Sequence, residues 1–141
     1  MGLTFCGTVF ACAARNGVLA CGSCADNRVR VIELANPHEL AVEVNSDESP
    51  YQVFGGLWSV AKLAFFEDGR YLLALYDLHG RQIPHPRWRY GVIETRNWRE
   101  VWRTELPVGE PLCVSPDGQL IARVRDGVLE VLPVDFSTAG R

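Results

Sequence analysis

The sequence contains one lysine, Lys62, and one methionine, and its formal net charge is only −3 over 141 residues. A charge this small gives no overall electrostatic attraction to nucleic acid or to an anionic membrane surface. The chain also lacks an apolar run long enough to cross a bilayer. We therefore expect neither nucleic acid nor a membrane among its partners.

We do not expect a secretory signal, because Met1 to Thr4 carry no basic residue ahead of the apolar stretch that follows. The number of cysteines is odd, which argues against a complete disulfide framework. These features predict reduced thiols and a cytoplasmic protein. The cysteines are Cys6, Cys12, Cys21, Cys24 and Cys113.

Catalytic and cofactor-binding motifs are scarce. Asp77, His79 and Ser115 are the residue types of a hydrolytic triad, but no Gly-x-Ser-x-Gly motif surrounds the serine. No glycine-rich phosphate-binding loop appears. Cys21 and Cys24 form a CxxC motif without the second ligand pair of a zinc site, so we interpret them as small residues that fill a tapered interior. We expect a protein that is not an enzyme and that holds no cofactor and no metal.

What the sequence does contain is an internal repeat. Asn16-Gly17, Asp68-Gly69 and Asp117-Gly118 lie roughly 50 residues apart, and apolar stretches flank each pair. Asn-Gly and Asp-Gly favour tight hairpin turns, while the apolar, β-branched and aromatic residues beside them favour strands. Each repeat is therefore predicted to begin with an antiparallel hairpin.

Further strands follow each hairpin, and no segment has a convincing helical period. Third strands are predicted at 28–34, 89–95 and 128–134, and fourth strands at 39–44 and 99–106. The stretch Leu57–Phe66 is expected to be a loop that enters a strand. After the third strand of the last repeat only Asp135 to Arg141 follow, so this repeat is predicted to lack its fourth strand.

Four-stranded antiparallel units in tandem are the pattern of β-propeller blades. Ser115–Ala122 resembles the first turn of a WD-repeat or TolB-type propeller blade, and Phe66–Ala74 is a looser match, although no Trp-Asp pair ends a third strand. The resemblance implies an all-β fold of about three four-stranded antiparallel propeller-like blades in a single domain, 1–141. The expected blades span about 3–48, 52–108 and 109–135.

Three blades do not close a comfortable ring, because closed propellers use at least about four. The chain is then part of a longer propeller, or two copies form a six-bladed homodimer, since two-fold closure is the commonest symmetry of homo-oligomers. In the dimer, Leu3–Cys6 would supply the missing strand of the partner's third blade. We expect a protein partner or a second copy of the chain to close the propeller.

Arginine and aromatic residues are concentrated between residues 79 and 103, where the local charge is about +4. Both residue types anchor protein interfaces, and loops on a rigid scaffold often carry binding function. The alternative is a solvated strand face of arginines, with Trp88, Tyr90 and Val92 pointing to the core. The predicted partner surface consists of Arg81, His85, Arg87, Trp88, Arg89, Tyr90, Trp98 and Arg99.

These features favour a module for protein interaction or assembly. The resemblance supports this expectation, because WD-repeat propellers mostly organise complexes, although a fold alone does not fix a function. The alternative is a propeller that binds a small ligand, a carbohydrate or a nucleotide, near its channel.

Overall fold

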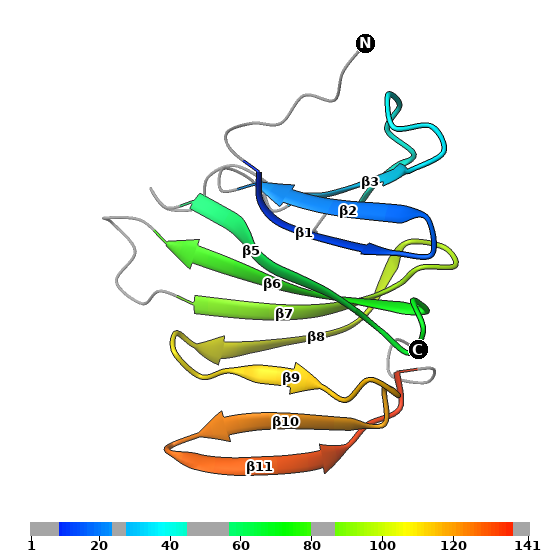
Figure 1. Ribbon diagram of the computed structural model, residues 1–141. Coiled ribbons are helices and arrows are strands. Elements are labelled where there is room, and N and C mark those ends of the chain that lie inside the picture. The colour runs from blue at the N-terminus through cyan, green and yellow to red at the C-terminus, as the bar shows by residue number, and fades with distance from the viewer. Residues whose placement is uncertain (1–8, 24–27, 45–56, 80–86, 137–141) are drawn as a thin grey trace.

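The computed structural model describes residues 9–23, 28–44, 57–79 and 87–136 (Figure 1). Within them the chain forms eleven β-strands in three antiparallel sheets, which we call blades 1 to 3. Blade 1 contains β1 (Val9–Arg15), β2 (Val18–Ser23), β3 (Val29–Glu33) and β4 (Val42–Val44). Blade 2 contains β5 (Leu57–Phe66), β6 (Tyr71–His79), β7 (Arg87–Glu94) and β8 (Arg99–Pro107). Blade 3 contains β9 (Leu112–Val114), β10 (Leu120–Arg125) and β11 (Val128–Pro133).

The predicted all-β fold is confirmed, with sheets of four, four and three strands. Strands are hydrogen-bonded to their chain neighbours in every sheet, as in a propeller blade. Two strand predictions were wrong in extent. Leu57–Phe66 is strand throughout, with a bulge between Val60 and Lys62, because it pairs with nearly the whole of β6. The fourth strand of blade 1 is only Val42–Val44, because its pairing with β3 covers only the three residues Val29 to Val31.

The repeated glycines lie at the hairpin turns, as predicted. Asn16 and Gly17 both have positive φ, 51° and 76°, which is the two-residue turn that fits the twist of a hairpin. Gly69 and Gly118, with φ of 84° and 73°, occupy the corresponding turns of blades 2 and 3. A further Asp-Gly turn, which the repeat had not drawn attention to, joins β10 to β11 at Asp126 and Gly127.

The hairpin turns of successive blades contact one another. Arg15 and Asp68 form an ion pair at 2.5 Å, and the Asn16 side-chain amide donates to the Asp68 carbonyl at 2.8 Å. From blade 2 to blade 3, the Glu67 N–H donates to the Pro116 carbonyl at 2.6 Å. The repeated turns therefore set the order of the blades as well as the ends of the strands.

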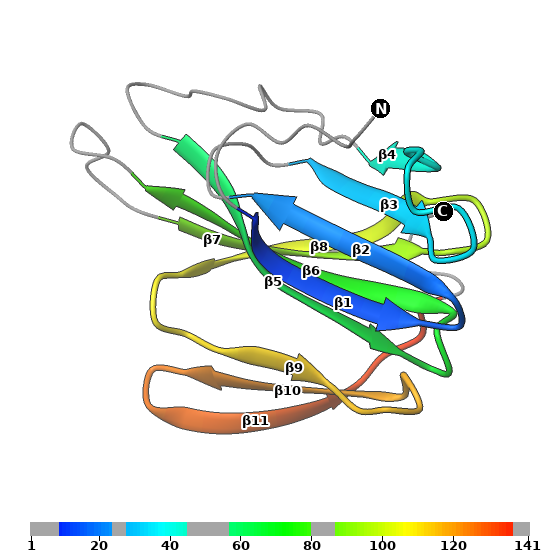
Figure 2. The same ribbon diagram turned by 45° about the horizontal axis from the view of Figure 1, so that its top comes forward.

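Blade 2 lies between the other two blades and is buried on both faces (Figures 1 and 2). Alternate residues of a strand point to opposite faces of a sheet. In β6, Leu72, Ala74 and Tyr76 pack in the cluster shared with blade 1. Tyr71, Leu73 and Leu75 pack in the cluster shared with blade 3. This explains why β6 is apolar along most of its length instead of alternating.

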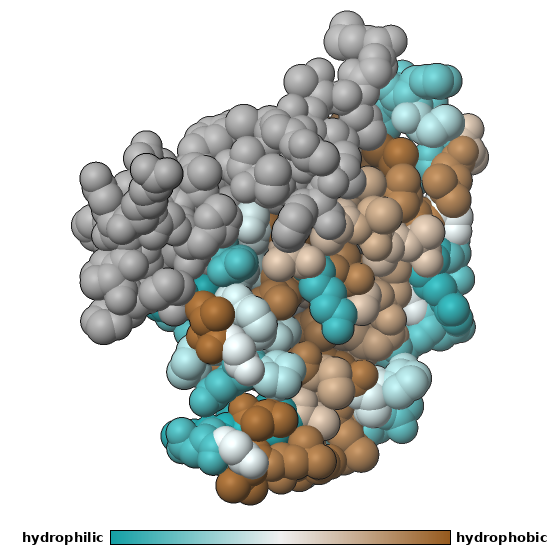
Figure 3. All heavy atoms as spheres, turned by 60° about the vertical axis from the view of Figure 1, so that its left-hand side comes forward, coloured by the Kyte–Doolittle hydropathy of each residue, from teal (hydrophilic) through white to brown (hydrophobic). Residues whose placement is uncertain are grey.

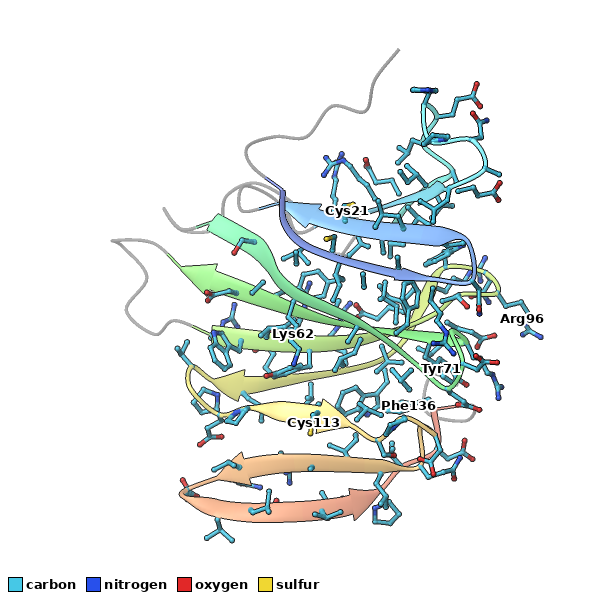
Figure 4. The ribbon with its side chains drawn as sticks, in the orientation of Figure 1. Cys21, Lys62, Tyr71, Arg96, Cys113 and Phe136 are labelled. Carbon is cyan, nitrogen blue, oxygen red and sulfur yellow. The ribbon has the colours of Figure 1, made fainter. Side chains whose placement is uncertain are left out.

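The chain beyond β11 returns to blade 2. Phe136 is 2% exposed, and its ring lies 5.4 Å from Phe66, 5.7 Å from Tyr71 and 5.7 Å from Trp102, centroid to centroid (Figure 4). Aromatic pairs at this spacing stabilise a core beyond the area they bury. In the described part of the chain, no helix has the length and apolar character needed to cross a membrane.

Candidate interaction surface

The predicted arginine and aromatic surface is divided between the two ends of β7. Arg87 and Trp88 begin this strand, whereas Trp98 and Arg99 follow it at the turn into β8. Eight residues of strand span roughly 25 Å, so the two pairs do not form one continuous surface. Arg81 and His85 lie outside the described residues.

Arg89 and Tyr90 are buried and so are not part of an exposed surface of this chain. Arg89 is 0% exposed, on the face toward blade 1, where its guanidinium lies over the ring of Tyr76 at 4.8 Å. Tyr90 points the other way, and its hydroxyl accepts a hydrogen bond from the Leu112 N–H at 3.2 Å. The expected solvated row of arginines is therefore wrong at Arg89, because blade 1 covers that face.

Burial also governs the chemistry of Tyr90. The low-polarity surroundings raise the pKa of its phenol, and the hydrogen bond from Leu112 opposes this effect only in part. The phenol of Tyr90 therefore stays neutral, and its hydrogen bond links β7 of blade 2 to β9 of blade 3. Its role is structural, between blades.

Three other arginines of this segment pair with acids of blade 2. Arg87 bonds Glu105 at 3.1 Å. Arg96 bonds Glu94 at 3.1 Å, and Arg103 bonds Glu100 at 2.5 Å. The Arg87–Glu105 pair joins neighbouring strands because β8 runs alongside β7, whereas the other two pairs are local along the chain.

The two tryptophans of the predicted surface are both half-buried. Trp88 packs against the cluster between blades 2 and 3. Trp98 has a φ of 55° in the β7–β8 turn and packs against the cluster between blades 1 and 2. Of the predicted set that the structure describes, only Arg99 is well exposed. The backbone N–H of Arg99 donates a hydrogen bond to the side-chain oxygen of Asn97 at 3.1 Å.

A different surface is exposed on blade 3. On the face of this blade that points away from blade 2, β10 and β11 present apolar side chains in register, with Ala122 opposite Val131 and Val124 opposite Leu129. Leu120 is 44% exposed, Val131 56% and Leu129 68%. Figure 3 shows apolar residues gathered at this end of the molecule.

The last strand, β11, extends this apolar surface to its second face. Val128 and Leu132 are exposed there in addition to the residues named above. A contiguous exposed patch of this kind marks an interaction site more often than scattered apolar residues do. The signal was present in the sequence, because 128–134 is apolar on both alternating faces except at Glu130, as a strand that is covered on both sides would be.

Two grooves border blade 3. The first, of about 220 Å³, lies over blade 3, where Leu112, Cys113, Ala122 and Val124 are among its lining residues, and reaches Lys62 of β5 (Figure 4). The second, of about 380 Å³, is more polar and lies between β8 and blade 3. Its lining includes Glu105, Glu110, Arg123 and Asp126.

Metal-binding side chains do not gather in the described residues, where no group of three or more His, Cys, Asp or Glu lies close enough to hold an ion. Cys12, Cys21 and Cys113 are free thiols there. Cys6 and Cys24, and with Cys24 the second half of the CxxC motif, lie outside the described residues.

Comparison with known proteins gives a match of fold. No protein-family model matches the chain, and no curated protein matches its sequence. A solved structure of hydrazine synthase from Kuenenia stuttgartiensis is similar over 76% of this chain, with a TM-score of 0.53 and 18% identity. The similar region spans 28% of that protein, so this chain corresponds to a minor part of its length. At this identity the match shows a shared arrangement of sheets.

Proposed function

We propose that the chain is an assembly module and not an enzyme, built from three WD-repeat or TolB-like propeller blades. A second copy of the chain completes the ring to six blades. The observation that carries this proposal is the exposed apolar face of blade 3. A face of Leu120, Val124, Leu129 and Val131 is stabilised when it is covered, at about 25 cal/mol for each Å² removed from water.

The way blades 1, 2 and 3 follow one another supports a further blade as the cover. Each of the two faces of blade 2 is buried by a neighbouring sheet, and the turns of adjacent blades bond to each other. Blade 3 presents an apolar face on its outer side, and Pro116 and Asp117 of its repeated turn are exposed. A sheet placed there repeats contacts the fold already makes twice.

Blade 1 of the second copy fits this position. Its outer face carries Leu19, which is half-buried, directly opposite Ile32, which is only 7% exposed in the single chain. Arg28 and Arg30 on the same blade both pair with Glu43, at 2.9 and 3.4 Å, so each arginine has a carboxylate beside it. With a two-fold axis, blade 3 of each copy packs on blade 1 of the other, and both contacts are the same.

A pair of substitutions tests the proposal. Val131→Lys places a charge in the middle of the blade 3 face, and Val108→Lys places the same charge at a valine of similar exposure, 48%, in the turn after β8. Size-exclusion chromatography with light scattering should give a dimer for the unmodified chain and for Val108→Lys. Val131→Lys should be a monomer, because a buried unpaired lysine is strongly unfavourable.

Circular dichroism of both variants verifies that the sheets remain intact. A folded Val131→Lys that keeps the dimer contradicts the blade 3 interface. An unmodified chain that is monomeric at every concentration contradicts the closure by a second copy.

A further inference from the structure

We propose that Cys12 and Cys21 form a modification site, a cross-strand dithiol that a low-molecular-weight disulfide such as oxidised glutathione converts into an intramolecular disulfide. The inference concerns the single chain and does not rest on the proposed dimer.

The register of blade 1 places the two cysteines opposite each other. Cys12 on β1 is the direct partner of Cys21 on β2. Opposite residues in an antiparallel pair have Cα atoms about 4.5–5.5 Å apart, which lies within the range that a disulfide bridges. The two thiols therefore need no movement of the backbone to meet.

The turn that closes this hairpin fixes the kind of pair they form. Asn16 and Gly17 make a two-residue turn, which leaves Arg15 and Val18 as a hydrogen-bonded pair. Hydrogen-bonded and non-hydrogen-bonded pairs alternate along the ladder, so Cys12 and Cys21, three steps away, form a non-hydrogen-bonded pair. Side chains are closest in such pairs, which favours a bond between the sulfurs.

The surroundings of the two thiols differ, and this assigns their roles. Cys12 is exposed, whereas Cys21 is only 8% exposed. Burial raises the pKa of the Cys21 thiol, and the neighbouring Cys12 raises it further.

The reaction proceeds by two exchanges. The Cys12 thiolate attacks one sulfur of oxidised glutathione, forms a mixed disulfide and releases one glutathione thiolate. The Cys21 thiolate then attacks the Cys12 sulfur and releases the second glutathione. Two protein thiols are oxidised to one disulfide, one glutathione disulfide is reduced to two thiols, and the two protons lost by the protein thiols are taken up by the released glutathione thiolates. The second exchange accelerates with pH, because the raised pKa of Cys21 limits its thiolate at neutral pH.

Peptide mapping after oxidation tests the site. The reduced full chain is incubated with oxidised glutathione, the remaining thiols are alkylated, and the linked peptides are measured by mass spectrometry. The Cys12–Cys21 link should be the main product in the folded chain, at least about tenfold more abundant than in the same chain unfolded in urea, where proximity is lost. Cys113→Ser is the matched control and should leave the link unchanged.

Cys12→Ser should abolish the link and leave Cys21 as a free thiol, because the buried residue does not meet glutathione directly. A folded chain that accumulates glutathione on Cys12 without forming the link would overturn the proposal. So would a link no more abundant in the folded chain than in the unfolded chain.

The proposed ring would cover this face of blade 1. The oxidation is therefore repeated on Val131→Lys, in which the face is open whether or not the unmodified chain dimerises. Absence of the link in both proteins overturns the dithiol site and leaves the dimer proposal untouched. Formation in Val131→Lys with strong protection in the unmodified chain supports the dithiol site and places it beneath the interface.

Discussion

Gly22 of β2 faces Val60 of β5 so closely that a β-carbon on the glycine would lie 2.3 Å from the Val60 β-carbon. Blades 1 and 2 approach each other at this point because the glycine has no side chain. Gly22 belongs to the CxxC motif, which we interpreted as small residues that fill a tapered interior. The close approach of Val60 agrees with this interpretation at Gly22.

The first prediction concerns this contact. Gly22→Ala should lower the free energy of unfolding by about 1–3 kcal/mol, because the Val60 β-carbon is held by its own backbone and the two blades must separate. Urea unfolding followed by tryptophan fluorescence measures the effect. In a Val60→Ala background the same substitution should cost clearly less. Equal costs in both backgrounds would show that the clash is not the cause.

The second prediction compares two arginines of β7. Arg89→Ala should destabilise the protein by about 2–4 kcal/mol, because it leaves a cavity beside Tyr76 in a fully buried position. Arg87→Ala, two residues away on the same strand, removes a partly exposed ion pair and should change stability by no more than about 0.5 kcal/mol. Chemical denaturation of both variants makes the comparison. Similar values for the two would contradict the burial of Arg89.

The third prediction uses two buried tyrosines that differ in their hydroxyl contacts. Tyr90→Phe removes the acceptor of the Leu112 N–H and should cost about 1–2 kcal/mol. Within the described residues the Tyr71 hydroxyl has no hydrogen-bond partner, so Tyr71→Phe should be neutral or slightly stabilising. Thermal unfolding of the two variants distinguishes them, and a reversed order would contradict the assigned link between blades 2 and 3.

The fourth prediction concerns alkaline pH. Burial raises the pKa of Tyr76, Tyr71 and Tyr90 above the usual value of 10.0. Below that value these phenols are protonated in both states and stability is complete. Above it the unfolded chain loses protons that the folded chain keeps, so stability falls as pH rises, by up to about 1.4 kcal/mol per pH unit for each such tyrosine.

Urea midpoints measured between about pH 8 and pH 11 check this dependence. Tyr76→Phe should reduce the slope above pH 10, because one raised phenol is removed. A midpoint that stays constant over the whole range would contradict the burial of the phenols.

The sequence predicted the fold better than the surface, and the reason is local. Turn residues such as Asn16-Gly17 and Asp117-Gly118 act within a few positions, so the hairpins and the blade order were predicted from residues alone. The burial of Arg89 depends on blade 1, which is distant in the chain. The alternation of arginines along β7 does not distinguish a strand face that is exposed to solvent from one that a second sheet covers.

The blade 3 surface was missed for a related reason. The apolar run around Val131 is also typical of a strand that is buried in the chain's own core. The pattern does not indicate whether a sheet of the same chain covers it. The phenylalanine at 136 was missed because it follows the last strand and carries no periodic pattern. Its position depends on contacts with Phe66, Tyr71 and Trp102, which are distant from it in the chain.

The mass of the unmodified chain in solution tests the central claim most directly. Sedimentation equilibrium should give twice the 15.7 kDa of the chain at concentrations up to about 100 μM, with dissociation on dilution. A single species of 15.7 kDa over the whole range would contradict the closure of the propeller by a second copy.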